Sequence, residues 1–115
     1  MTTTATALVA TIITAGENLD RFSRRLAARV NQSPLHLARV ISRGSQIYPV
    51  RLDSVGGTAT YLECEFRPRQ TGATVSKEVA LDVYARLEHF EVVRLSLVDD
   101  AGTVVGDVGE IRAAG

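Results

Sequence analysis

The sequence predicts an α+β domain, and three observations support this prediction. Two segments carry apolar residues at helical spacing, several others have the composition or alternation of β-strands, and turn residues separate them. Helices that alternate with strands in this way pack on a sheet around one core. A chain of 115 residues, 45% of them hydrophobic, is long enough to bury such a core, so we expect residues 1–115 to form a single domain.

The first strand and the first helix are predicted from the N-terminal third of the chain. Residues 7–13 form an apolar run rich in β-branched side chains, which is typical of a buried strand, and Gly16 follows in a turn. Asn18 predicts the start of a helix, because its side-chain oxygen can accept from an unpaired amide of the first turn. Four apolar residues recur at helical spacing: Leu19, Phe22, Leu26 and Val30. Four arginines lie away from this face: Arg21, Arg24, Arg25 and Arg29.

Proline and glycine divide the middle of the chain. Pro34 ends the helix, because the residue before a proline is biased away from helical angles. Residues 35–42 are predicted to form a strand with both faces partly covered, and residues 43–45 a turn. A further strand is predicted at residues 47–54, where Pro49 favours a sheet edge or a bulge.

The next strand has the clearest alternation in the sequence. Gly56 and Gly57 predict a hairpin turn before it. Residues 58–67 then present one set of side chains to the core: Leu62, Cys64 and Phe66. The opposite face carries a polar set: Tyr61, Glu63 and Glu65.

A second helix and a terminal hairpin complete the pattern. Ser76 is the predicted cap of this helix, whose apolar stripe contains Val79, Val83, Leu87 and Phe90. Residues 91–98 alternate as a strand, residues 99–102 form a turn, and residues 103–108 add a short last strand. The resulting order predicts a ferredoxin-like split βαβ sandwich, with an antiparallel sheet, two helices on one face and a terminal hairpin.

The predicted core combines the apolar faces of both helices with one face of the best-defined strand. Its members are Leu19, Phe22, Leu26, Leu62, Cys64, Phe66, Val83 and Leu87.

No pattern of catalytic or metal-binding residues is visible in the sequence. His36 and His89 lie more than fifty positions apart, without an acid at the spacing of a triad or a metal site. Cys64 alternates with apolar residues and is expected to be a buried thiol rather than a nucleophile. We therefore expect no enzymatic activity, no metal ion and no cofactor.

A cytoplasmic location is expected from three features. A single cysteine cannot form an internal disulfide, which fits a reducing compartment. The apolar run at residues 7–13 is too short to span a bilayer. Residues 1–6 contain no positive side chain of the kind that a secretory signal requires.

The segment ENLDRFSRRLAARV, together with the strand predicted after it, resembles the opening of ACT-type regulatory domains. In that family a strand ends in a short loop, a Leu and an Arg start the helix, and the next strand follows. The resemblance covers the pattern of residues 6–98. It implies a small regulatory module that binds an amino acid or another small anion and acts on a partner enzyme or transporter.

The candidate ligand site is the junction between the first strand and the first helix: Thr14, Gly16, Glu17 and Asn18. Backbone amides around Gly16 and Asn18, at the positive end of the helix, would hold a carboxylate, although Glu17 would oppose an anion there. Alternatively, Gly16 serves only to allow a tight turn. A second function also stays open, a structural assembly subunit of a virion or scaffold that has no small-molecule ligand.

Self-association is predicted from charge and from apolar strand surface. Residues 1–69 hold nine Arg against five Asp and Glu, a net charge of +4, and residues 70–115 hold four Lys and Arg against eight, a net charge of −4. Opposite charges on two parts of a molecule favour pairing of copies, and we expect a homo-oligomer, most simply a dimer. Six strand residues suggest more apolar surface than one helical layer covers: Leu35, Leu37, Ile41, Val93, Leu95 and Leu97.

The charge and the predicted sheet face both argue against nucleic acid as a partner. A nucleic-acid-binding domain usually carries a net basic charge, whereas this chain is neutral overall. An RNA-binding sheet of this type would display aromatic residues, but here Glu63 and Glu65 lie beside Tyr61 on the predicted exposed face.

Overall fold

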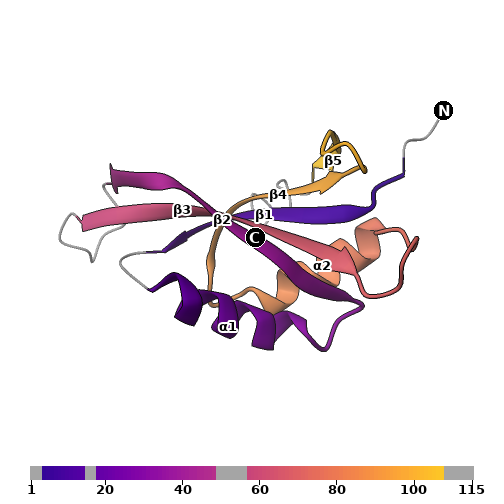
Figure 1. Cartoon of the computed structure of the whole chain (residues 1–115), viewed down its shortest axis with the longest axis horizontal. Coiled ribbons are helices and arrows are strands. Elements are labelled where there is room, and N and C mark those ends of the chain that lie inside the picture. The colour runs from indigo at the N-terminus through magenta and orange to yellow at the C-terminus, as the bar shows by residue number, and fades with distance from the viewer. Residues whose placement is uncertain (1–3, 15–17, 49–56, 108–115) are drawn as a thin grey trace.

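The computed structural model describes residues 4–14, 18–48 and 57–107 of the chain (Figure 1). Its elements follow in the order β1 (Ala7–Thr14), α1 (Leu19–Val30), β2 (Leu35–Tyr48), β3 (Gly57–Pro68), α2 (Lys77–Arg86), β4 (Glu91–Val98) and β5 (Val104–Asp107). Two helices and an antiparallel sheet confirm the predicted α+β class.

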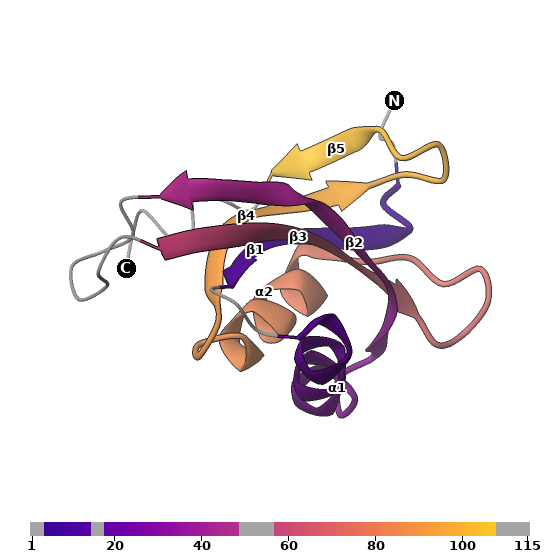
Figure 2. The same cartoon turned by 60° about the vertical axis from the view of Figure 1, so that its left-hand side comes forward.

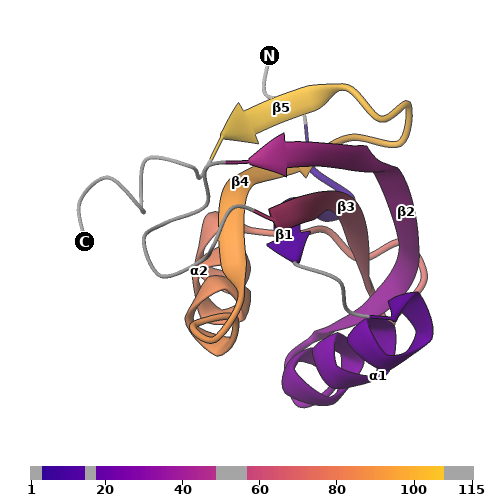
Figure 3. The same cartoon turned by 90° about the vertical axis from the view of Figure 1, so that its left-hand side faces the viewer.

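The five strands form one sheet in the order β2-β3-β1-β4-β5, and every neighbouring pair is antiparallel. The first strand of the chain therefore lies at the centre of the sheet, between β3 and β4. Figures 2 and 3 show α1 and α2 on the same side of the sheet. No described helix packs on the opposite face of the sheet.

Polar caps set the limits of α1, as the sequence predicted for its start. The side-chain oxygen of Asn18 accepts hydrogen bonds from the amides of Asp20, at 2.9 Å, and Arg21, at 3.1 Å. After the helix, the buried hydroxyl of Ser33 donates to the carbonyl of Val30 at 2.8 Å and accepts from the amide of Leu35 at 3.1 Å. Ser33 thus ties the end of α1 to the start of β2.

The second helix is capped at its start, and the segment that follows it contacts α1 through an aromatic side chain. Ser76 caps α2 by accepting from the amide of Val79 at 3.2 Å, as predicted. Phe90, which follows α2, packs edge-on against Phe22 of α1 with the ring centres 5.7 Å apart. The guanidinium of Arg25 lies 4.3 Å from the centre of the Phe90 ring. Contacts of this kind hold the ends of the helical layer together.

The core contains seven of the eight residues predicted for it, and the prediction was wrong for Leu19. The seven buried residues are Phe22, Leu26, Leu62, Cys64, Phe66, Val83 and Leu87. Leu19 is 45% exposed, because it is the first residue of α1 and lies at the end of the stripe that packs on the sheet. Helical spacing identifies the face of a residue but does not show how far along the helix the covering surface extends.

The predicted turn at residues 43–45 is wrong, because β2 continues through it as one strand. In the pairing with β3, Ser42 lies opposite Leu62 and Ser45 opposite Thr60, so β2 contains one more residue than its partner over this stretch. The polar sequence around Gly44 therefore forms a bulge instead of a turn. Residues 49–54 of the next predicted strand, Pro49 among them, and Gly56 of the predicted hairpin turn lie outside the described residues.

The expected surplus of apolar strand surface is largely absent. Leu35 and Leu95 are buried in the core of the monomer, and Leu37 and Leu97 pack against that core. Of the six residues considered, only Val93 is a large exposed hydrophobic side chain. The helices cover more of the strand residues than the loose alternation in the sequence suggested.

A pair of leucines on α1 tests the assignment of core and surface. Leu26→Ala removes a fully buried side chain and is expected to lower the free energy of unfolding by about 2–5 kcal/mol. Leu19→Ala changes a half-exposed side chain of the same helix and is expected to cost less than about 1 kcal/mol. Chemical denaturation followed by circular dichroism measures both values. Equal losses for the two variants would contradict the arrangement of α1.

Candidate functional site

The alternation of side chains along the strands divides the sheet into two different faces. On β1, Leu8, Ala10 and Ile12 belong to the core under the helices. Val9 and Thr11 therefore point to the opposite face, where they line a groove with a volume of about 490 Å³. All five strands and the turn at residues 99–102 contribute side chains to this groove. This volume lies in the range of small-molecule binding sites.

Apolar side chains occupy part of the groove. Val9 and Ile41 are half-buried, Val98 is nearly fully buried, and Val104 on the edge strand β5 is 49% exposed. These residues come from four different strands, and the sheet brings them together on one face. They provide a surface on which small apolar groups can pack.

At the β2–β3 side of the groove, two arginines hold one carboxylate that is mostly, but not fully, buried. Arg39 Nη2 lies 3.2 Å from Glu65 Oε1, while Arg67 Nη2 and Nε lie 2.5 Å and 2.6 Å from Oε2. The Glu65 side chain is only 13% exposed, whereas those of Arg39 and Arg67 are 64% and 45% exposed. Glu65 therefore fixes the direction of two guanidinium groups that still face solvent.

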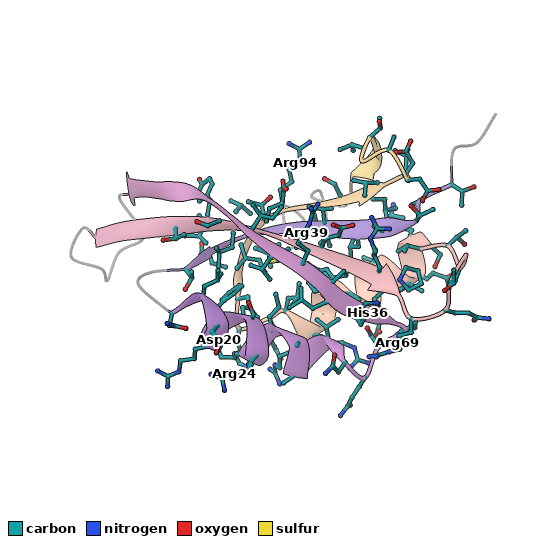
Figure 4. All side chains as sticks on the ribbon, in the orientation of Figure 1. Asp20, Arg24, His36, Arg39, Arg69 and Arg94 are labelled. Carbon is teal, nitrogen blue, oxygen red and sulfur yellow. The ribbon has the colours of Figure 1, made fainter. Side chains whose placement is uncertain are left out.

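The middle of the groove is lined by residues of both charges. Thr11 of β1 lies opposite Glu63 of β3 on one side and Arg94 of β4 on the other. Figure 4 shows Arg39 and Arg94 on the side of the sheet away from α1, whereas Asp20 and Arg24 extend from the outer side of α1. None of the four arginines of α1 is among the residues that line the groove.

The turn between β4 and β5 forms the acidic end of the groove. Asp99 Oδ1 accepts hydrogen bonds from the amides of Ala101 and Thr103, both at 2.9 Å. Gly102 has a φ of +82°, which favours glycine, and its amide donates to the carbonyl of Asp99 at 3.0 Å. Asp99 thus acts as a turn former, as predicted, and the neighbouring Asp100 is exposed beside it.

The junction predicted as a ligand site lies outside this groove. Thr14 is the last residue of β1 and pairs with Thr60, and Asn18 caps α1. Gly16 and Glu17 lie outside the described residues. Because the Asn18 side chain already accepts from two amides of the first turn, those amides are engaged within the chain. A ligand site at this junction stays a prediction, because two of its four residues lie outside the described residues.

Other chemistry-bearing residues do not form a reactive centre in the described structure. Burial raises the pKa of Cys64 from its ordinary 9.0 to about 12, with a smaller contribution from the negative charge of Glu63. His36 lies on β2 opposite Arg67, and His89 is exposed after α2. Among residues 4–14, 18–48 and 57–107, no three His, Cys, Asp or Glu side chains come together as a metal site.

Neither described helix has the length and apolar composition needed to cross a membrane.

The groove was not predicted from the sequence, although one signal pointed to its face. Alternation correctly placed Glu63 and Glu65 on the side of β3 away from the core. Arg67 shares this strand, whereas Arg39 and Arg94 come from β2 and β4, and only the strand order shows that these two strands flank β3 and β1. The spacing of residues in the sequence does not show which strands are adjacent in the sheet.

Comparison of the chain with models of protein families, with curated proteins and with solved structures finds no match.

The raised pKa of Cys64 predicts a specific dependence of stability on pH. Above pH 9 the thiol ionises in the unfolded chain, while in the folded chain it keeps its proton up to a pKa of about 12. The unfolded state therefore binds fewer protons in this window, and stability falls as the pH rises. Between pH 8 and pH 10, the free energy of unfolding should fall by about 1.4 kcal/mol more in the wild type than in Cys64→Ala.

Denaturant titrations of both proteins at pH 8, 9 and 10 measure this difference. The Cys64→Ala variant supplies the control, because the other groups that titrate in this range are the same in both chains. An identical pH dependence for the two proteins would show that Cys64 is not desolvated in the folded state.

Proposed function

We propose that the chain is a small non-catalytic module of ACT-like type that binds an amino acid or another small anion, self-associates and regulates a partner protein. The observation that carries this proposal is the groove on the open face of the sheet, with its two fixed arginines. Paired guanidinium groups recognise carboxylates through bidentate hydrogen bonds. A binding role also agrees with the absence of a catalytic cluster from the sequence patterns described above.

The ferredoxin-like part of the proposal is supported by the order of elements. Strand, helix, two strands, helix and strand follow one another from β1 to β4, and these four strands have the order β2-β3-β1-β4. This order agrees with a split βαβ unit, in which the two helical connections pack on one face. We regard β5 as an addition at the β4 edge of this unit.

The groove is better supported as the ligand site than the junction at Thr14 and Asn18. At the junction, the side chain of Asn18 engages the amides of Asp20 and Arg21. In the groove, the guanidinium groups of Arg39 and Arg67 are held in place while more than a third of each side chain is exposed. The two sites can be separated by variants, which makes the choice testable.

A thermal-shift screen of amino acids and nucleotides tests the proposed function. A compound that binds only the folded chain raises the melting temperature as its concentration increases. We expect at least one amino acid to do so and Val104→Trp, which places a large ring at the groove, to abolish the shift. Leu81→Trp is the matched control, because Leu81 is an exposed apolar residue on α2 and should leave the shift unchanged.

A shift that persists in Val104→Trp but disappears in Asn18→Ser would assign the ligand to the junction instead. The Asn18→Ser substitution removes the carboxamide but retains a side-chain oxygen that can cap the helix, so the variant should still fold. If no compound shifts the melting temperature, the regulatory proposal fails and the structural assembly function is favoured.

Self-association is proposed separately and is supported by the charge difference between the two parts of the chain and by two open sheet edges. Both β2 and β5 have a neighbouring strand on one side only in the described sheet, and edge strands offer unpaired backbone groups to another chain. Light scattering at tens of micromolar should give the mass of a dimer at low salt and a smaller mean mass at high salt. The mass of one chain under both conditions would contradict the proposal, and large ordered assemblies would favour the structural function.

A further inference from the structure

The two ends of the groove differ in net charge: Arg39 and Arg67 with Glu65 sum to +1, Asp99 and Asp100 to −2, and Glu63 and Arg94 in the middle balance each other. This difference narrows the class of ligand. Arg39 and Arg67 lie at the β2–β3 side, and Asp99 and Asp100 lie in the turn after β4. We propose that the groove binds a short peptide of about three residues with free termini, its carboxylate at the arginines and its amino group at the turn. This inference rests on the proposed function and names the ligand class of the same groove.

The total charge of the groove narrows the proposed ligand, an amino acid or another small anion, to a molecule with charges of both signs. Its described lining contains three arginines and four carboxylates, so the net charge of these groups is −1. An anion would gain from the arginines but would be repelled by the rest of the lining. A molecule that carries one charge of each sign, at opposite ends, meets an opposite charge at both ends.

The arginine end has hydrogen-bond donors available for a carboxylate. Each guanidinium carries five N–H groups, and the contacts with Glu65 involve one nitrogen of Arg39 and two of Arg67. The exposed parts of both side chains retain further donors. Because Glu65 already fixes their orientation, less conformational freedom is lost when a ligand binds.

The distance between the two ends sets the length of the ligand. β3 and β4 are separated by β1 alone, which corresponds to two strand spacings, or about 10 Å. An extended peptide spans at most about 3.3–3.6 Å per residue, so about three residues cover this distance. Val9 and Val98 lie between the ends and suit a small apolar side chain at the middle position.

At the acidic end, Asp100 is the better partner for the amino group of the peptide. One oxygen of Asp99 is already engaged by the amides of its own turn, whereas Asp100 is exposed at the groove. An ammonium group there would form a charge-assisted hydrogen bond with the carboxylate.

Isothermal titration of the full chain with the tripeptide Ala-Val-Ala tests this inference. Amidation of the C-terminus and acetylation of the N-terminus each remove one charge of the peptide, and each should weaken binding by about tenfold, the loss of one charge-assisted hydrogen bond. Arg67→Gln should weaken binding of the free peptide by a similar factor. In this variant, amidation of the peptide should cause no further loss of affinity. Asp100→Asn should in the same way remove the effect of acetylation.

Arg24→Gln is the matched control, because Arg24 is an exposed arginine that pairs with Asp20 on the outer side of α1. Its binding of all three peptides should equal that of the wild type. Equal binding of the free, amidated and acetylated peptides to the wild type would overturn the inference without relying on any variant.

Two further results separate this inference from the proposed function. Absence of Ala-Val-Ala binding, together with a thermal shift by a single amino acid that Val104→Trp abolishes, would overturn the peptide assignment and leave the proposed function standing. Amidation could also weaken binding to Arg67→Gln and to Arg39→Gln as much as it weakens binding to the wild type. The peptide carboxylate would then bind elsewhere, and the peptide assignment would be overturned.

Discussion

The structure depends on the fact that both helices pack on the same face of a sheet whose strands alternate. On the central strand β1, Leu8, Ala10 and Ile12 enter the core, and Val9 and Thr11 necessarily face the other way. Every strand repeats this division, since successive side chains of a strand point to opposite faces. The core and the groove are thus two consequences of one alternation, and a shift of one residue in register would exchange them.

The alternation also places charged residues next to one another on the open face, where they must find partners. Glu65 is the clearest example, because its carboxylate is mostly buried although it lies on the face without helices. A buried carboxylate is costly unless it is paired, and Arg39 and Arg67 supply that pairing from two strands. The same contacts orient the arginines, so a structural requirement of the sheet produces a pre-organised group of donors at the groove.

Residues close together in the sequence were sufficient to predict the helix starts and the buried face of β3. Asn18 and Ser76 cap the two helices as expected, because a cap is made within one turn of chain. Leu62, Cys64 and Phe66 are buried as their alternation predicted. The prediction failed where a partner strand decides the outcome: the expected turn at residues 43–45 is a bulge at residues 43–44, because β3 pairs with β2 on both sides of them. Leu19 is exposed because the covering surface ends before it.

The sequence by itself determined the α+β class, most of the core and the residue types available on each face, since all of these follow from periodicity and capping. Only the tertiary structure decided which faces and strands became neighbours. Arg39, Glu65 and Arg94 are far apart along the chain and belong to β2, β3 and β4, yet the strand order brings them to one groove. Strand order results from how the helical connections pack across the whole sheet, and no local spacing encodes that global arrangement.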